Sequence, residues 1–272
     1  MKFQLKALAA ALVLAAVAVP AQASIDANAS GNGSFILTVL DKVANVSAAF
    51  DLGKNYSDFS IAGTSFANSG ADAQGVSFSW DLAGNSDYSG AWTSFLNSAN
   101  LANVTYAVTA GDNLGNGAGS RGYITTYVSA GASTTTTSLL TALGNMDTYV
   151  GNTAVGAGST LLTADNGAAF QAPATTYYNG NKNNNTGVVT VGAIGTSLGV
   201  IQSVSAAANL SPVTNTMFGN GAKFTLTTAG ALSYTTNPIV TAPVPEADTW
   251  AMMMVGLGLM GYMARRRNRN QA

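Results

Sequence analysis

Aspartates are the residues of this chain best suited to chemistry. The chain contains no histidine and no cysteine, which excludes Ser-His-Asp and Cys-His nucleophiles and zinc sites built on imidazole or thiolate ligands. Paired carboxylates can still act as general acid and base, as in glycoside hydrolysis. Residues 24–236 contain no Glu, and their ten Asp are Asp26, Asp41, Asp51, Asp58, Asp72, Asp81, Asp87, Asp112, Asp147 and Asp165.

These Asp stand in turn-like sequence, such as 71–73 and 111–113. Asp in such contexts usually accepts hydrogen bonds from nearby backbone N–H groups. A hydrolase would instead need two aspartates facing each other in a cleft. An Asp-based hydrolase is therefore the third of three functional hypotheses, behind a non-enzymatic protein and a binding module. We expect no enzyme activity, no catalytic residue and no cofactor.

Calcium is the metal that the Asp residues would suit best. Asp87 and Asp112 lie in the Gly- and Asn-containing stretches 84–87 and 111–116, and flexible loops with oxygen ligands are what calcium needs. Neither stretch has the spacing of an EF-hand loop. Ordinary Asx turns are the favoured explanation of both stretches, so we assign no metal site and keep Asp87 and Asp112 as weak calcium candidates.

Several tyrosines lack apolar neighbours in register and could be exposed: Tyr88, Tyr123, Tyr127, Tyr177 and Tyr178. Tyr177 and Tyr178 precede the Asn-rich stretch 179–185. An exposed tyrosine beside amide side chains can stack on a sugar ring and hydrogen-bond its hydroxyls. Tyr177 and Tyr178 are therefore the candidate glycan contacts, with partial burial in the fold as the alternative reading.

The composition of the body, residues 24–236, limits its partners. Only 8% of the whole chain is charged, against about 25% in ordinary globular proteins. The ten Asp of the body outnumber its five Lys and Arg, so phosphate backbones would be repelled and nucleic acid is excluded as a partner. Its polar residues are mostly Ser, Thr, Asn and Gly, which suit a hydrated extracellular matrix. Without cysteine, no disulfide can stabilise it.

Strand patterns dominate the body. Alternation with period two predicts strands over 46–52, 76–82 and 104–109, and a hairpin over 223–235 with a Gly-containing turn. Apolar residues at helical spacing predict two short helices, over 92–99 and 139–150. The prediction is a mainly β body, an antiparallel β-sandwich with one or two short helices. A subdivision near 151–187 is possible.

The N-terminus has the layout of a cleavable secretory signal. Lys2 and Lys6 precede the apolar run 7–19, and the small-residue site Ala21-Gln22-Ala23 follows. Thirteen apolar residues are too few for a retained membrane span. We therefore predict a signal peptide over residues 1–23, export through the secretion translocon, and a mature chain that begins at Ser24.

The C-terminus has the layout of a membrane stop. A proline-rich linker, 237–249, leads to an apolar run over 250–264, which Trp250 opens and a basic tail, 265–272, closes. Tryptophan and arginine are typical anchors at the two membrane interfaces. We predict one transmembrane helix over 250–264 with a cytoplasmic basic tail. Fifteen residues are short for a full span, which fits a provisional anchor.

The spacing of Gly256, Gly258 and Gly261 matches a dinucleotide fingerprint, but no strand precedes it.

This arrangement resembles the PEP-CTERM sorting signal, in which a Pro-Glu motif, a short apolar helix and an arginine cluster follow one another. The chain departs from the family in one place, because the third motif residue, commonly proline, is Ala247. The resemblance covers about the last 30 residues and the N-terminal signal. The residues that carry it are Val244, Pro245, Glu246, Ala247, Trp250, Gly256, Gly258, Gly261, Arg265, Arg266 and Arg267.

The resemblance implies a partner and a destination. In that family a membrane enzyme called exosortase recognises the tail. The chain would pass through an inner-membrane intermediate and reach the cell surface or the medium, where the family is associated with extracellular polysaccharide or biofilm matrix. The leading hypothesis is a non-enzymatic surface protein of this kind. The alternative is a carbohydrate-binding module that recognises the exopolysaccharide.

Overall fold

The computed structural model describes residues 25–63, 66, 69–129, 135–154, 167–172, 190–206, 211–239 and 247–269. The chain divides into two compact units, Met1–Asn237 and Pro238–Ala272, called the body and the tail below. The predicted signal peptide with Ala21 and Ala23, the tyrosines Tyr177 and Tyr178, and the motif residues Val244, Pro245 and Glu246 lie outside the described residues.

All strands of the described body belong to one antiparallel sheet. Its main path runs in the order β3-β11-β10-β8-β5-β4-β1-β2-β6, with β7 paired to β4 and β9 paired to β8. The strands are β1 (Ser34–Asp41), β2 (Val46–Asn55), β3 (Ser77–Asp81), β4 (Val104–Asp112), β5 (Gly122–Tyr127), β6 (Ala168–Gln171), β7 (Gly192–Ala193), β8 (Ser197–Val204), β9 (Thr214–Met217), β10 (Lys223–Leu226) and β11 (Ala231–Thr235).

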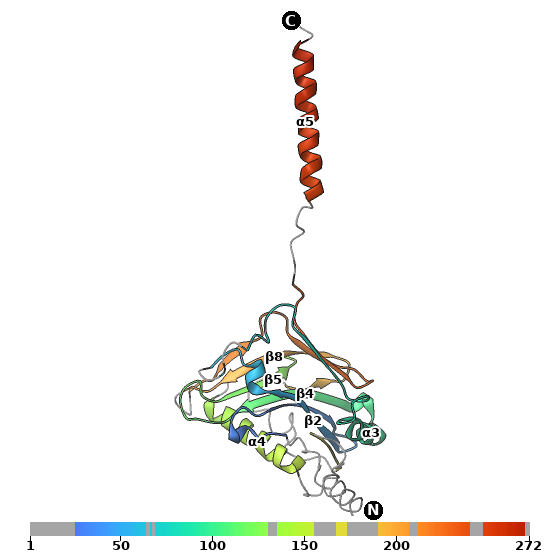
Figure 1. Cartoon of the computed structure of the whole chain (residues 1–272). Helices are drawn as coiled ribbons and strands as arrows, with labels where there is room; N and C mark the ends of the chain where they lie inside the picture. The colour runs from blue at the N-terminus through green and yellow to red at the C-terminus, as the bar shows by residue number, and fades with distance from the viewer. Residues whose placement is uncertain are drawn as a thin grey trace, which may run out of the picture. The chain divides into compact units, whose positions relative to one another are not determined.

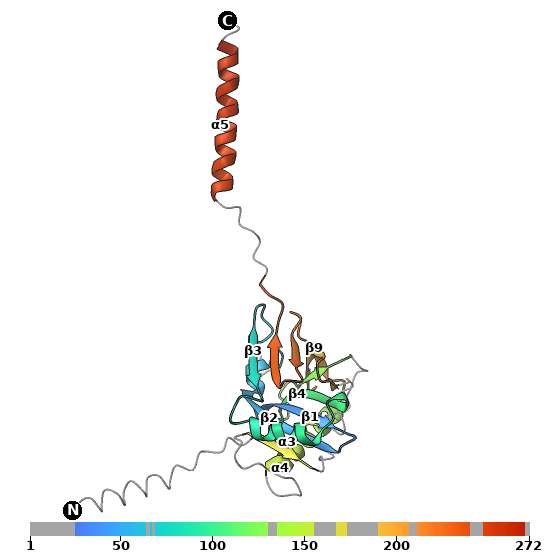
Figure 2. The same cartoon turned by 90° about the vertical axis from the view of Figure 1, so that its right-hand side faces the viewer.

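The sheet curls until its two ends face each other (Figures 1 and 2). Strand β8 allows this because its first residues pair with β10 and its last residues pair with β9. The curl is closed where Trp80 Nε1 on β3 donates to the carbonyl of Leu52 on β2 at 2.8 Å. The prediction of a mainly β, antiparallel body is confirmed, and the two facing layers belong to one continuous sheet.

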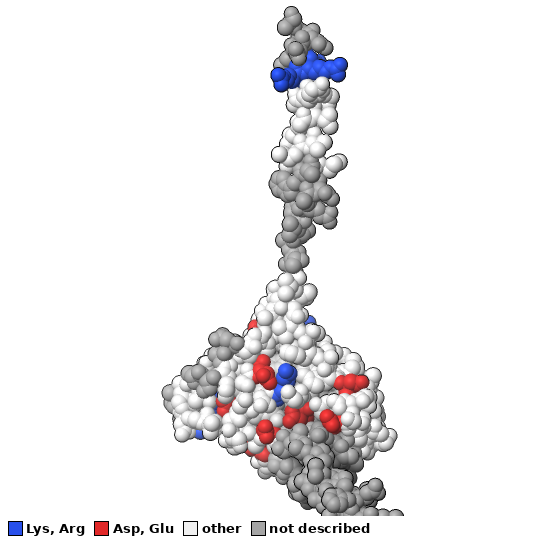
Figure 3. Space-filling model, in the orientation of Figure 1, with Lys and Arg blue, Asp and Glu red and all other residues white. Residues whose placement is uncertain are grey.

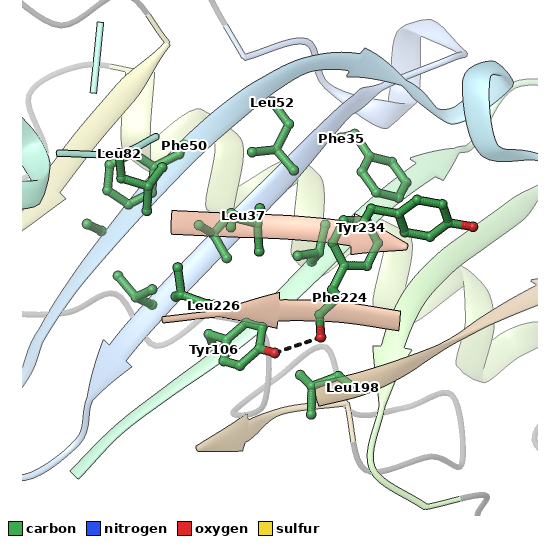
Figure 4. Packing of buried hydrophobic residues seen from close by; sticks show 14 of the residues in the cluster. Phe35, Leu37, Phe50, Leu52, Leu82, Tyr106, Leu198, Phe224, Leu226 and Tyr234 are labelled. Atoms are coloured by element: carbon green, nitrogen blue, oxygen red, sulfur yellow. Dashed lines mark hydrogen bonds between the residues drawn. The ribbon is translucent and has the colours of Figure 1, made fainter. Parts of the chain in front are cut away.

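The main apolar core lies inside the curl. Figure 4 shows the β10–β11 hairpin facing strands β1, β2 and β4 across this core. Phe35 and Phe224, both fully buried, meet across the core with ring centroids 5.8 Å apart. The buried Tyr106 hydroxyl donates to the Phe224 carbonyl at 2.9 Å. The alternating residues predicted to face inward on 46–52 and 104–108 all belong to this core: Val46, Ala48, Phe50, Leu52, Val104, Tyr106 and Val108.

A second, smaller core lies on the outer face of the sheet beneath helix α4 (Thr136–Ala154). In both views α4 lies along the side of β1 and β2 that faces away from β11 (Figures 1 and 2). Leu139, Leu143 and Met146 of α4 pack on Ile36 of β1 and Tyr123 of β5. Strand β1 is therefore buried along its whole length on both faces.

The other body helices are short: α2 (Tyr56–Phe59), α3 (Ser89–Ser98) and the 3₁₀ turns η1 (Asn28–Ser30) and η2 (Leu101–Asn103). The predicted helices over 92–99 and 139–150 correspond to α3 and α4. Trp92 and Phe95 of α3 are buried in the main core, as their helical spacing predicted. Helix α2 has a capping box, in which Asp58 accepts from the Asn55 N–H at 2.9 Å.

The tail contains helix α5 (Ala247–Arg269). Among the described residues, no helix is sufficiently long and apolar to span a membrane. The prediction of a transmembrane helix over 250–264 is therefore not supported. The physical reason is that its apolar stretch is fifteen residues, includes three glycines and ends at Arg265, whereas a span needs about 20 mostly apolar residues.

Candidate functional site

The body ends in a clamp around Thr236 and Asn237. The Thr236 hydroxyl donates to the carbonyl of Ala73 at 2.7 Å and accepts from the Val76 N–H at 2.9 Å. The backbone of Asn237 donates to Asn220 and accepts from Gly75, both at 2.8 Å. Because these bonds follow directly on β11, the fold fixes the chain up to Asn237.

The carboxylate of Asp72 supports these contacts. Asp72 accepts from the N–H groups of Gly219 and Asn220 at 2.8 and 3.0 Å, which orders the turn that binds Asn237. The sequence predicts a linker that begins at Asn237. The Asn-Pro dipeptide at 237–238 is a turn signal, and it marks the point where the body ends.

Helix α5 contains the predicted sorting residues Gly256, Gly258, Gly261, Arg265, Arg266 and Arg267, all of them exposed. Residues 252–267 are all exposed, and Ala247, the residue that departs from the family motif, is the first residue of the helix. Gly258, Gly261 and Arg265 share one face because they are three and four positions apart. A Cβ placed on Gly256, Gly258 or Gly261 would meet nothing within 4 Å.

The arginines close α5. Arg265, Arg266 and Arg267 lie in its last turns, and they form a basic band on a helix that is otherwise uncharged where drawn (Figure 3). Cations at the C-terminal end of a helix interact favourably with its macrodipole. Another protein can recognise helix α5 by its exposed surface, its small-residue face and its basic end.

The aspartates of the body are largely occupied by backbone N–H groups. Asp147 accepts from Asn28 and Ala29 at the start of η1, at 2.6 and 3.1 Å. In the part of the body that the structure describes, the aspartates that accept at least one backbone N–H are Asp41, Asp51, Asp58, Asp72, Asp81, Asp112 and Asp147. Their placement in turns and caps is the one that the sequence context indicated.

Two aspartates have shifted acidities. Burial raises the pKa of Asp51, with Asp26 adding to the effect, and these outweigh the hydrogen bonds from Gly53 and Ser34. Burial also acts on Asp41, but N–H groups of Ala44, Asn100 and Val43 donate to it and hold its pKa below the ordinary value. Both shifts are accounted for by folding contacts.

The two calcium candidates lie in separate turns. Asp112 ends β4, is 3% exposed, and accepts from the Leu114 N–H at 3.0 Å. Asp87 lies before α3, and its own N–H donates to Asn85 Oδ1 at 2.9 Å. Within the described ranges, no three acidic side chains gather where they could hold a metal ion.

The tyrosines differ in exposure. Tyr123 is fully buried, and Tyr88 is 8% exposed with its hydroxyl donating to the Asp51 carbonyl at 2.5 Å. Burial, helped by the charges of Asp51 and Asp87, raises the pKa of Tyr88 to about 12. Tyr127, at the end of β5, is half-buried and presents part of its ring to solvent. Of the described tyrosines Tyr88, Tyr123 and Tyr127, it is the one whose ring is partly accessible to solvent.

Comparison with known proteins gives a match in the tail. No curated protein and no solved structure matches the chain. The family model of the PEP-CTERM protein-sorting motif matches residues 243–267, a range that includes most of α5 and the arginines Arg265, Arg266 and Arg267. The C-terminal segment of this chain is therefore a PEP-CTERM protein-sorting motif.

Proposed function

We propose that this chain is an exported surface or secreted protein that an exosortase-type membrane enzyme processes at its C-terminus, and that its body is non-enzymatic and associates with extracellular polysaccharide. The observation that carries the proposal is the sorting motif at residues 243–267. It lies in the second compact unit, Pro238–Ala272, after a body whose hydrogen-bonded end is at Asn237. An intermediate held at the inner membrane by the enzyme precedes release or surface display.

The non-enzymatic part of the proposal draws its support from the aspartates. The chain has no His and no Cys, so carboxylates would have to carry any acid–base chemistry. Seven of the nine body aspartates that the structure describes accept backbone N–H bonds, most of them in turns and caps. A carboxylate held in this way stabilises the fold and is poorly placed to exchange protons with a substrate.

Processing can be tested by intact-mass analysis of the full chain produced in a host that has an exosortase. Protein from the medium and the cell surface is expected to lack the N-terminal 23 residues and the arginine cluster. Pro245→Ala combined with Glu246→Ala is expected to leave the arginines in place and to stop delivery to the surface. Pro238→Ala, in the same linker but outside the matched motif, is the matched control.

Two outcomes would contradict the sorting proposal. One is recovery of the full-length chain from the cytoplasm with both ends intact. The other is normal processing of the Pro245→Ala, Glu246→Ala variant, because the motif would then be dispensable. Loss of processing in the Pro238→Ala control would show instead that linker conformation, rather than the motif, governs cleavage.

A further inference from the structure

The outer face of the sheet is covered over one half and open over the other. Helix α4 packs on the half formed by β1, β2 and β5. On the half formed by β3, β11, β10 and the start of β8, with Tyr127 at its margin, the outward side chains are exposed or half-buried, and no element that the structure describes lies on it. This second region is called the open face below.

A row of hydroxyl groups crosses four neighbouring strands of the open face. Ser79 of β3 pairs with Ser233 of β11, Ser233 pairs with Thr225 of β10, and Thr225 pairs with Ser197 of β8. Directly paired residues of antiparallel strands point to the same face. The hydroxyls of Ser197 and Thr225 lie 2.7 Å apart, so one donates to the other and the second keeps its hydrogen for an outside acceptor.

A parallel row lies two residues further along each strand. It contains Ser77, Thr235, Lys223, Gly199 and Tyr127. The Tyr127 ring lies over Gly199, because a Cβ at Gly199 would stand 2.6 Å from its Cε1 atom and 2.8 Å from its Cζ atom. Glycine therefore lets the ring lie along the sheet and end the row with an aromatic surface.

The charge of the open face excludes most classes of partner. Asp81 and Lys223 are its two charged residues, and their charges cancel. One lysine is too few to neutralise a phosphate backbone, and one carboxylate cannot hold a calcium ion. The face also lacks the apolar centre that protein–protein interfaces have. A neutral partner rich in hydrogen-bonding groups is the one that complements this surface.

We propose that the open face binds a neutral polysaccharide, whose chain lies across the strands along the hydroxyl rows. This inference deepens the proposed function and rests on it, because it names the surface through which the body associates with the matrix. Neighbouring strands are about 4.8 Å apart, so the first row offers a hydroxyl at each step, comparable to the length of one hexopyranose unit, and the second row adds the hydroxyls of Ser77 and Thr235. Tyr127 provides a stacking surface for a sugar ring at the end of one row.

Polymer binding would depend on the repetition of weak contacts. A single exposed hydroxyl contributes little, because water competes for the same hydrogen bonds. Four hydroxyls in line contact successive units of one chain, so binding by the second and later units becomes intramolecular. The open face should therefore retain a long neutral glucan and bind a monosaccharide poorly.

The test is co-sedimentation of the full chain with microcrystalline cellulose, a neutral glucan with flat chains, and with curdlan, a second neutral glucan. The wild-type chain is expected to sediment with at least one of them. Ser79→Glu combined with Ser233→Glu places two carboxylates on neighbouring strands of the first row and should weaken binding at least tenfold. Tyr127→Ala should weaken it several-fold.

Thr93→Glu is the matched control, because it adds a carboxylate at an exposed threonine on α3, outside the open face. It should bind like the wild type. Circular dichroism of each variant separates lost binding from lost folding. If the double variant unfolds, Ser233→Ala with Thr225→Ala replaces it and should still weaken binding measurably.

Failure of this inference is distinguishable from failure of the proposed function. If the wild-type chain sediments with neither neutral glucan, or if the open-face variants bind as well as Thr93→Glu, the open face is not a glycan surface. Neither result affects the processing assay, which reads the masses of both ends in cells. Correct sorting of a chain that binds no glucan would leave the exosortase route standing and overturn this inference alone.

Discussion

The two halves of the outer sheet face show how one surface can serve two purposes. Beneath α4 the face consists of Ile36, Leu40, Ala49 and Tyr123, all at most 1% exposed. On the open face most of the outward positions carry hydroxyls, and Ser77, Ser79 and Thr235 are exposed. Both halves belong to the same antiparallel sheet. The difference lies in which half a helix covers.

This difference separates stability from recognition. The inner core is continuous behind both halves, so the open strands are already anchored by Phe78, Phe224 and Tyr234 on their other side. Antiparallel sheets tolerate one solvated face when the opposite face is buried. The open half can therefore carry hydroxyls chosen for an outside partner, whereas the covered half must fit α4.

The largest effect is expected from Leu143→Ala, beneath α4. Leu143 is fully buried, and its truncation leaves a cavity between α4 and the sheet, so the free energy of unfolding should fall by about 2–5 kcal/mol. On the open half, Thr225→Val should change it by about 0.5 kcal/mol or less. Urea denaturation of the full chain measures both.

A loss below about 1 kcal/mol for Leu143→Ala would contradict the view that α4 closes a packed core. An unexpectedly large loss for Thr225→Val would show that the hydroxyl row contributes to folding. The comparison between the two halves would then lose its basis, because both would be needed for stability.

A smaller effect is expected from adding one methyl group to each half. At Gly111, a Cβ would lie 2.6 Å from Leu143 Cδ2 and 2.7 Å from Asn28 Oδ1, both within the packed covered half. Gly111→Ala should therefore cost about 1–3 kcal/mol. At Gly199 the same substitution meets the half-exposed Tyr127 ring, which can swing into solvent, so Gly199→Ala should cost less.

A double-mutant cycle sharpens this pair. Because Leu143→Ala removes the nearest atom that the new methyl would meet and leaves Asn28 in place, Gly111→Ala should cost less in that background. No such coupling should exist between Gly199→Ala and Leu143→Ala. Equal costs at Gly111 and Gly199, or strict additivity at Gly111, would mean that the covered half is no more tightly packed than the open one.

The sequence predicted the parts of the fold that alternate. The sequence predicts strands β3 and β4 and the β10–β11 hairpin because each of these strands has one apolar face and one polar face. Strand β1, Ser34–Asp41, is buried on both faces and reads as a continuous apolar run, which alternation does not detect. Strand β8 was missed for the same reason along most of its length.

The two functional regions differ in the same way. The sorting motif is linear, so its residues could be named from the sequence alone. The open face combines positions 77–81, 127, 197–199 and 223–235, which only the pairing of distant strands brings into rows. The transmembrane prediction over 250–264 is not supported, because Trp250 and the arginines at the ends of the apolar run do not make the run long enough to span a membrane.

The smallest effect concerns a carboxylate on the covered half. Asp51 pairs with Ile36 in the β1–β2 ladder, and burial raises its pKa above the ordinary value of 3.8. Between 3.8 and the raised pKa, the folded state binds more protons than the unfolded state, so this group lowers stability as the pH rises through that window. Asp51→Asn removes the titration while keeping an oxygen that can accept from Gly53 or Ser34.

The stability of Asp51→Asn relative to the wild type should therefore be more favourable at pH 7 than at pH 3. Urea denaturation of both proteins at several pH values measures this difference, and the other titrating groups cancel in it. Asp26→Asn should change the pH dependence of the stability in the same direction as Asp51→Asn does, but by less. Asp26 is a smaller cause of the raised Asp51 pKa than burial is. A difference that is independent of pH, or that favours the wild type at pH 7, would mean that Asp51 is better solvated than its place on the covered half implies.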